Sequence, residues 1–132
     1  MKLQREDSTD LNLITSYDAL HIAINRDRRE RSLIVTPERI VDNWATAGFS
    51  GLSEADIAQL RELSPALVLI GSGQRQHFPT PVLLRPLIEA GIGFEIMDTG
   101  SACRTYNILA SEGRRVAAVL LLDTVSGPNS QT

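Results

Sequence analysis

The chain has 132 residues and a formal net charge of −3. This length fits one domain, and the 42% hydrophobic and 22% charged residues are ordinary for a globular protein, which excludes disorder of the whole chain. The acidic balance also excludes a global field that would attract nucleic acid or an anionic membrane.

Soft metal ligands and disulfide partners are scarce. Cys103 is the only cysteine, so neither an intramolecular disulfide nor a cysteine metal cage can form. His21 and His77 are the only histidines. We expect both at the surface, His77 in a loop and His21 on the outer face of a strand. No metal and no cofactor are therefore expected.

The two ends of the chain are polar. Residues 1–10 carry mixed charge, with neither the apolar core of a secretion signal nor the Arg-rich character of a mitochondrial presequence. No run of the chain reaches the roughly 18 apolar residues of a membrane span. We therefore expect a cytoplasmic protein without an integral membrane segment. Residues 1–10 are predicted to be flexible, residues 11–125 to form a single α/β domain, and residues 126–132 to be a disordered tail.

The first half of the chain is rich in predicted strands. Apolar residues alternate over residues 20–24, which is typical of a half-buried strand. The charge cluster at residues 26–31 is expected to be a solvated turn. Residues 32–35 form a short apolar, β-branched run, and residues 40–44 suggest another strand, with Trp44 as a core anchor.

Helices and strands alternate from residue 53 onward. A serine with an acidic residue three positions later predicts a capped helix over residues 53–63. Residues 66–70 indicate a buried strand. Residues 80–91 indicate a second helix, which Pro86 should kink or split because proline lacks the backbone donor and its ring clashes with the preceding turn.

The last third repeats this alternation. Residues 94–97 predict a strand, and Asp98 or Thr99 can cap a helix that runs to about Glu112. Residues 116–122 are the longest apolar run and should form a central strand. Strands that alternate with helices predict an α/β sheet covered on one or both faces.

A glycine-containing segment follows the predicted strand at residues 66–70. Such a loop can turn its backbone donors toward an anion. The dinucleotide-binding fingerprint fails, however, because Gln76 stands where its third glycine would be. We therefore expect Gly71 and Gly73 to serve the backbone geometry of a tight turn, which calls for positive φ.

The segment 97–107 leads a strand into a helix N-terminus, where free amides and the helix dipole attract an anion. Arg104 adds a cation and is expected to turn toward the Gly71 loop or a neighbouring carboxylate. Cys103 could be activated by the dipole, but it lacks a nearby base, so we expect a packed, inert thiol. One helix row is predicted to face the sheet, and it consists of Ala102, Tyr106 and Leu109.

These two segments together define a candidate binding cleft between the Gly71–Gly73 loop and the Asp98–Asn107 helix start. No catalytic residue is assigned. The candidate binding residues are Gly71, Gly73, Arg75, Asp98, Thr99, Cys103, Arg104, Tyr106 and Asn107. A small-molecule or anion-binding enzyme that uses this cleft is one interpretation, and a capped helix with purely structural side chains is the other.

Three segments also carry a resemblance to a known family. They are residues 32–37 with Trp44, residues 69–73, and above all residues 97–109 (MDTGSACRTYNIL), continuing through EGRRVAA at residues 112–118. The sequence resembles a family of small domains of formally unknown function whose mitochondrial member is the third assembly factor of respiratory complex I, NADH:ubiquinone oxidoreductase. The resemblance covers about residues 12–122.

This resemblance implies an α/β domain with a mixed sheet and a hammerhead-like hairpin region, packed on helices. It also implies a non-enzymatic accessory domain that binds another protein, in the assembly of a respiratory or other complex. We expect a bacterial cytoplasmic member with a protein partner, and the sequence leaves self-association open. Two positions depart from the family pattern, the flexible Gly100-Ser101 pair and Pro86.

Overall fold

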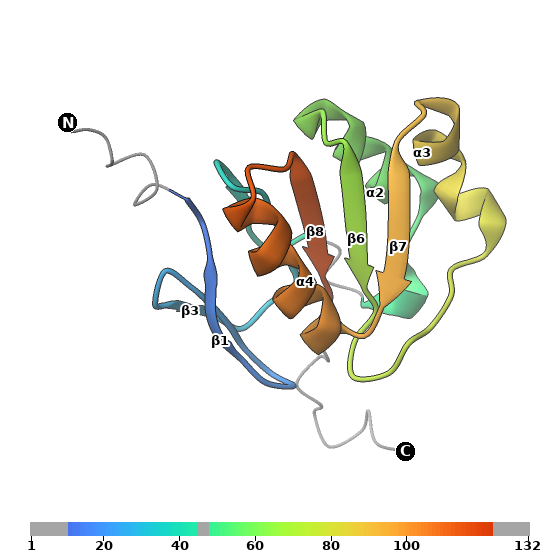
Figure 1. Cartoon of the computed structure of the whole chain (residues 1–132). Helices are drawn as coiled ribbons and strands as arrows, with labels where there is room; N and C mark the ends of the chain where they lie inside the picture. Colours follow the sequence, from blue (N-terminus) through green and yellow to red (C-terminus); the bar gives the residue numbers. More distant parts are fainter. Residues whose placement is uncertain (1–10, 45–47, 123–132) are drawn as a thin grey trace, which may run out of the picture.

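The computed structural model describes residues 11–44 and 48–122 (Figure 1). The predicted flexible segment 1–10 and the predicted tail 126–132 lie outside the described residues. Within the described ranges, no helix is long and apolar enough to cross a membrane. Nor do three His, Cys, Asp or Glu side chains of those ranges gather into a group that could hold a metal ion.

A five-stranded mixed sheet forms the centre of the molecule, in the strand order β5-β4-β8-β6-β7. Strand β6 runs parallel to both β7 and β8, whereas β4 is antiparallel to both β8 and β5. The strands are β4 (Leu33–Val35), β5 (Ile40–Val41), β6 (Leu67–Gly71), β7 (Gly93–Met97) and β8 (Val116–Leu120). The mixed α/β sheet that the resemblance implied is therefore present.

Strand β8 is central, as its apolar run predicted. Every residue of it is buried, and alternate side chains enter different hydrophobic clusters. Val116, Ala118 and Leu120 join one cluster, while Ala117 and Val119 join the other. A strand covered on both faces needs apolar side chains at every position, which explains the continuous run. The strand ends at Leu120, two residues earlier than expected.

The two faces of this sheet are covered by different helices (Figure 1). Helix α4 (Thr99–Ser111) packs on one face through Ala102, Cys103 and Tyr106. The other face is covered by α2 (Glu54–Ala58), the 3₁₀ segment η2 (Gln59–Leu63) and α3 (Arg85–Glu89). These elements contribute Ile57, Leu60 and Leu87 to the hydrophobic cluster on that face. The predicted row of Ala102, Tyr106 and Leu109 does face the core, with Leu109 partly buried.

Helix boundaries follow the local chemistry of the sequence. Ser53 and Asp56 form a capping box, in which the Asp56 N–H donates to Ser53 Oγ at 3.1 Å and the Ser53 N–H donates to Asp56 Oδ2 at 3.0 Å. Pro86 splits the predicted second helix into the 3₁₀ segment η3 (Pro81–Leu84) and α3. Pro86 then lies in the first turn of α3, where a missing N–H breaks no helical bond.

A separate three-stranded antiparallel sheet precedes the central sheet, where the resemblance implied a hairpin region. It consists of β1 (Ile14–Tyr17), β2 (Ile22–Ile24) and β3 (Asp27–Arg29). The prediction of a solvated turn over residues 26–31 is wrong, because β3 lies inside it. The turn is only Asn25-Arg26, whose φ angles of 50° and 77° are typical of the tightest hairpin connections.

The prediction that His21 lies on an exposed strand face is also wrong. The residue is only 9% exposed, and all three residues of β2 beside it are buried. Leu20, the first of the alternating apolar residues 20–24, lies in the preceding turn and is exposed. His21 is covered because its ring contacts the polar side chains of Ser16 and Asp18, which the alternation pattern does not reveal.

Trp44 is a buried core residue, as predicted, although it lies outside a strand. Strand β5 ends at Val41, and Asn43 adopts a φ of 57°, which turns the chain. The indole N–H of Trp44 donates to Gln59 Oε1 at 2.8 Å and so connects this loop to η2. His77 is exposed in a loop, as predicted.

Candidate functional site

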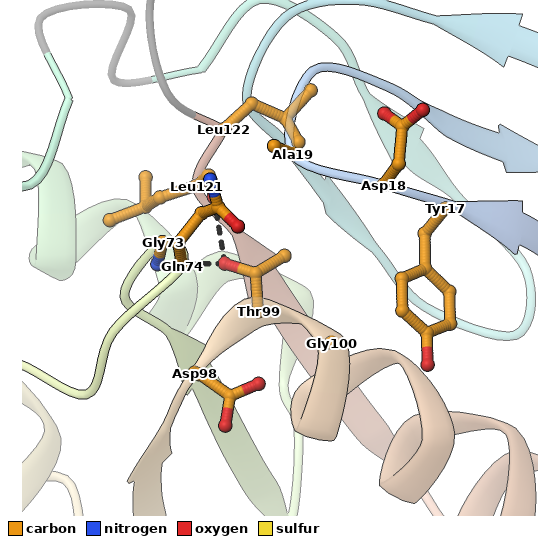
Figure 2. Close-up of a pocket in the computed structure, with 10 residues that line it drawn as sticks. All are labelled: Tyr17, Asp18, Ala19, Gly73, Gln74, Asp98, Thr99, Gly100, Leu121 and Leu122. Atoms are coloured by element: carbon orange, nitrogen blue, oxygen red, sulfur yellow. Dashed lines mark hydrogen bonds between the residues drawn. The ribbon is translucent and has the colours of Figure 1, made fainter.

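The candidate site lies where strands β6, β7 and β8 end. Because these strands are parallel, their carboxyl ends meet at one edge of the sheet, the usual place of ligand sites in α/β proteins. A pocket of about 170 Å³ opens there (Figure 2). Its lining comes from the β1–β2 turn, the β6 loop, the start of α4 and the end of β8, and consists of Tyr17, Asp18, Ala19, Gly73, Gln74, Asp98, Thr99, Gly100, Leu121 and Leu122.

The prediction of positive φ is confirmed for Gly73 but is wrong for Gly71, which is the last residue of β6. Gly73 has a φ of 110°, which favours glycine strongly. Gly71 is required by close packing instead, since a Cβ atom there would lie 2.8 Å from the Cα atom of Thr99. Helix α4 can therefore start directly against the end of β6.

Thr99 lies in the pocket lining and hydrogen-bonds to two neighbouring segments of the chain (Figure 2). Its hydroxyl donates to the carbonyl of Leu121 at 2.7 Å and accepts the N–H of Gly73 at 2.8 Å. Its own N–H donates to the carbonyl of Gly73 at 2.8 Å. A hydroxyl can donate and accept at once, so one side chain connects the β6 loop, the start of α4 and the end of β8.

Asp98 caps helix α4 and places a negative charge in the pocket wall. Its Oδ1 accepts the N–H of Ser101 at 2.8 Å, and its Oδ2 accepts the Ser101 hydroxyl at 2.8 Å. The Ser101 amide and hydroxyl, with a smaller contribution from the charge of Arg104, hold the pKa of Asp98 below its usual value. This carboxylate competes with any anion for the helix N-terminus, so the anion site predicted there is disfavoured.

Arg104 does not point to the Gly71 loop, and it forms no ion pair with a carboxylate of the described residues. Its guanidinium donates to the Tyr17 hydroxyl and, at 3.1 Å, to Ser101 Oγ. The guanidinium carbon lies 6.0 Å from the centre of the Tyr17 ring. The expected direction was wrong because Tyr17, an acceptor far away in sequence, comes within reach only through the packing of β1 against α4.

Cys103 lies beneath the helix rather than in the pocket. It is 1% exposed, and burial raises the pKa of its thiol to about 12. The nearby charge of Arg104 opposes this shift but does not overcome it. Since only the thiolate reacts, the structure agrees with an inert, packed thiol.

Tyr106 and Asn107 also lie outside the pocket, where they attach strand β1 to helix α4. The Tyr106 hydroxyl donates to the carbonyl of Asn12 at 2.7 Å. The Asn107 side chain accepts the N–H of Ile14 at 2.8 Å and donates to its carbonyl at 2.8 Å. Arg75 is exposed and is not part of the pocket lining. Of the nine candidate binding residues, the structure thus brings Gly73, Asp98 and Thr99 into the pocket.

The pocket includes residues that the sequence did not indicate. Tyr17 is the last residue of β1, Asp18 and Ala19 lie in the turn that follows it, and Leu121 and Leu122 directly follow β8. No local pattern marks them, because their position depends on how the three-stranded sheet packs beside α4.

Comparison with known proteins supports the family that the sequence resembles. The profile of the family described as proteins of unknown function (DUF498/DUF598) matches residues 14–121. The NADH dehydrogenase [ubiquinone] 1 alpha subcomplex assembly factor 3 of Bos taurus is 31% identical over 90% of this chain. The chain spans only 65% of the length of that relative.

Solved bacterial structures share the fold. A protein of Bordetella parapertussis is 39% identical with a TM-score of 0.81, over 88% of this chain and 99% of that chain. A Mth938-like domain of Bordetella pertussis is 32% identical with a TM-score of 0.79, over 100% of this chain and 98% of that chain. With a matching profile over most of its length and a shared fold, the chain belongs to the DUF498/DUF598 family.

Proposed function

We propose that this chain is an accessory domain that binds another protein during the assembly of a respiratory complex. The observation that carries the proposal is its similarity, over about nine-tenths of its length, to relatives named as complex I assembly factors. The similarity to bacterial proteins of known structure supports a bacterial member. A cytoplasmic location is part of the proposal.

An apolar flank beside the edge of the central sheet is the surface that we propose for the partner. It consists of Phe78, Val82 and Ile88, three exposed residues of the segment that connects β6 to the edge strand β7 in the sequence. Phe78 is the most exposed of them, at 68%. Large apolar side chains that remain in water lower the free energy when a partner covers them.

A second candidate function uses the pocket at the carboxyl ends of the parallel strands. That location favours a bound small molecule. The volume of about 170 Å³ limits the ligand to a few heavy atoms. Because Asp98 contributes a carboxylate to the wall, a cation or a neutral hydrogen-bonding compound fits better than an anion. This alternative needs no protein partner.

Affinity purification of the tagged full chain from its native cell tests the two functions together. We expect a defined protein partner, retained by the unmodified chain and lost with Phe78→Asp or Ile88→Asp. Ile108→Asp is the matched control, because Ile88 and Ile108 are both helical and both 59% exposed. Recovery of a tightly held metabolite without any protein, or equal loss with Ile108→Asp, contradicts the proposed surface.

A further inference from the structure

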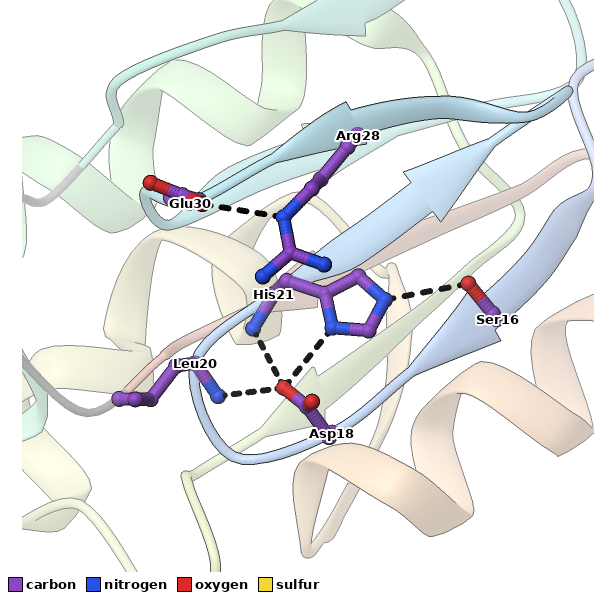
Figure 3. A network of polar contacts seen from close by, with 6 residues as sticks. All are labelled: Ser16, Asp18, Leu20, His21, Arg28 and Glu30. Atoms are coloured by element: carbon purple, nitrogen blue, oxygen red, sulfur yellow. Dashed lines mark hydrogen bonds and ion pairs between the residues drawn. The ribbon is translucent and has the colours of Figure 1, made fainter.

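A polar cluster on the hairpin sheet contains a serine, a histidine and an aspartate (Figure 3). Ser16 and Asp18 are two residues apart and therefore project to the same side of the chain. The N–H of Asp18 donates to the carbonyl of His21 at 3.0 Å, which places His21 opposite Asp18 in the antiparallel pairing. The hairpin thus brings the three side chains to one face, with Asp18 at the rim of the pocket described above.

The distances in this cluster match those of a nucleophile, a base and an orienting acid. Ser16 Oγ lies 3.1 Å from His21 Nε2, and His21 Nδ1 lies 2.8 Å from Asp18 Oδ1. This short contact does not have the geometry of a hydrogen bond, but the negative charge of Asp18 beside Nδ1 favours the tautomer that carries the proton there. Nε2 is then free to accept the hydroxyl proton of Ser16.

The orienting carboxylate is itself held in place. Asp18 Oδ1 accepts the N–H groups of Leu20 and His21, both at 2.9 Å. The bond from Leu20 contributes most to lowering the pKa of Asp18, followed by the His21 side chain. The group facing the imidazole is therefore an ionised carboxylate in a fixed position.

The surroundings differ for the base and the nucleophile. His21 is covered, whereas Ser16 is exposed and can be reached by a substrate. The strand register places Ser16, Ala23 and Arg28 in one cross-strand row. Arg28 is held through its Nε by Glu30 Oε2 at 3.0 Å, and Figure 3 shows its guanidinium directed toward the His21 ring. A cation in this row, although it is paired with Glu30, can stabilise negative charge that develops on a carbonyl oxygen.

We propose that Ser16 and His21 form a nucleophilic site for small carboxylic esters, with Asp18 as a positioning residue. Ser16 Oγ attacks the carbonyl carbon while its proton moves to His21 Nε2. The ester C–O bond breaks, His21 returns the proton to the departing oxygen, and an alcohol leaves an acyl group on Ser16. Water then attacks the acyl group by the same steps, which releases the carboxylic acid and restores the serine.

This site is independent of the proposed protein-binding role, because its test needs no partner. The purified full chain is treated with a fluorophosphonate, which transfers its phosphonyl group to the oxygen of an activated serine and releases fluoride. Intact and peptide mass spectrometry should find one adduct, at Ser16, and none after Ser16→Ala. Ser101 is an internal control, since its hydroxyl donates to a carboxylate, Asp98 Oδ2 at 2.8 Å, and not to a histidine.

Two variants separate chemistry from folding. His21→Gln and Asp18→Asn should each slow labelling by roughly 10²-fold or more, with unchanged circular dichroism. The amide oxygen of Asp18→Asn can still accept the turn N–H groups, so a purely structural Asp18 predicts no change. With p-nitrophenyl acetate as substrate, Asp18→Asn should lower kcat and leave KM unchanged. Labelling of Ser16 no faster than that of Ser101 overturns the proposal. So does labelling of Ser16 at the same rate in both variants as in the unmodified chain.

Discussion

The two sheets of this protein are held together by different forces. The five-stranded sheet is buried on both faces, and its central strand β8 consists entirely of buried apolar residues. The hairpin sheet contributes only Ile14, Ile22 and Ile24 to a hydrophobic core cluster. Its remaining attachment is polar and comes from helix α4 and from an ion pair of 2.8 Å between Arg29 of β3 and Asp42, which follows β5. The first sheet depends on apolar burial from many directions, whereas the second depends on a few specific contacts.

Three side chains of α4 make these contacts with the segment around β1. Tyr106 reaches the backbone of Asn12, Asn107 holds both backbone groups of Ile14, and Arg104 reaches the Tyr17 hydroxyl. Each of them serves as an anchor although the sequence suggested a binding site. We therefore expect the hairpin sheet to open more readily than the central sheet, because regions with fewer buried apolar contacts unfold locally at lower free energy.

The largest expected effect is the protection of the single thiol. Cys103 lies in the cluster shared by both sheets, and the pKa of its thiol is raised to about 12. In the native protein at neutral pH, a thiol reagent should react at least roughly 10³-fold more slowly than with free cysteine. Absorbance of the released chromophore measures the rate, and the denatured chain is the control. A rate similar to that of free cysteine would show that α4 does not stay packed.

Truncation of equivalent core residues should distinguish the two sheets. Leu120→Ala in β8 is expected to lower the free energy of unfolding by about 2–5 kcal/mol. Ile22→Ala in β2 also removes a fully buried side chain, but part of its effect should appear as local opening of the hairpin. Urea denaturation measures the global loss and amide hydrogen exchange the local one. If the two variants gave the same loss in urea denaturation and the same pattern of amide exchange, the two sheets would unfold as one cooperative unit.

Removal of a polar anchor should loosen only the hairpin sheet. Asn107→Leu keeps a similar volume but leaves the N–H and carbonyl of Ile14 without their partner, at a cost of about 1–3 kcal/mol. Amide exchange should accelerate at Ile14 and Ala23 and remain slow at Val119. Ile108→Ala, an exposed change on the same helix, is the control. Uniform acceleration across both sheets would contradict the comparison.

The smallest expected effect concerns the loop that follows β6. Gly73→Ala places a side chain at a φ of 110°, which should lower the free energy of unfolding by about 1 kcal/mol or somewhat more. Gly93→Ala is the matched control, because its added Cβ would meet its nearest neighbour at an ordinary 3.6 Å. Thermal denaturation of both variants measures the difference. Equal stability of the two variants would remove the backbone explanation for Gly73.

Much of the central sheet was readable from the sequence because its signals are local. The continuous apolar run of β8 identified a strand buried on both faces. The Ser53–Asp56 capping box and the Asp98 cap placed the starts of α2 and α4. Pro86 marked the break before α3. Each of these features depends on residues a few positions apart, so no tertiary information was required.

The hairpin sheet and the pocket were decided by tertiary structure. Strand β3 consists of charged residues and β1 buries only Ile14, so neither shows an alternating pattern. Arg104 and Asn107 read as binding residues because nothing local revealed that Tyr17 and Ile14, about ninety positions earlier, would be their partners. Polar side chains have no preferred partner in sequence, and only the packing of the chain decides whether they bind a ligand or another part of the same molecule.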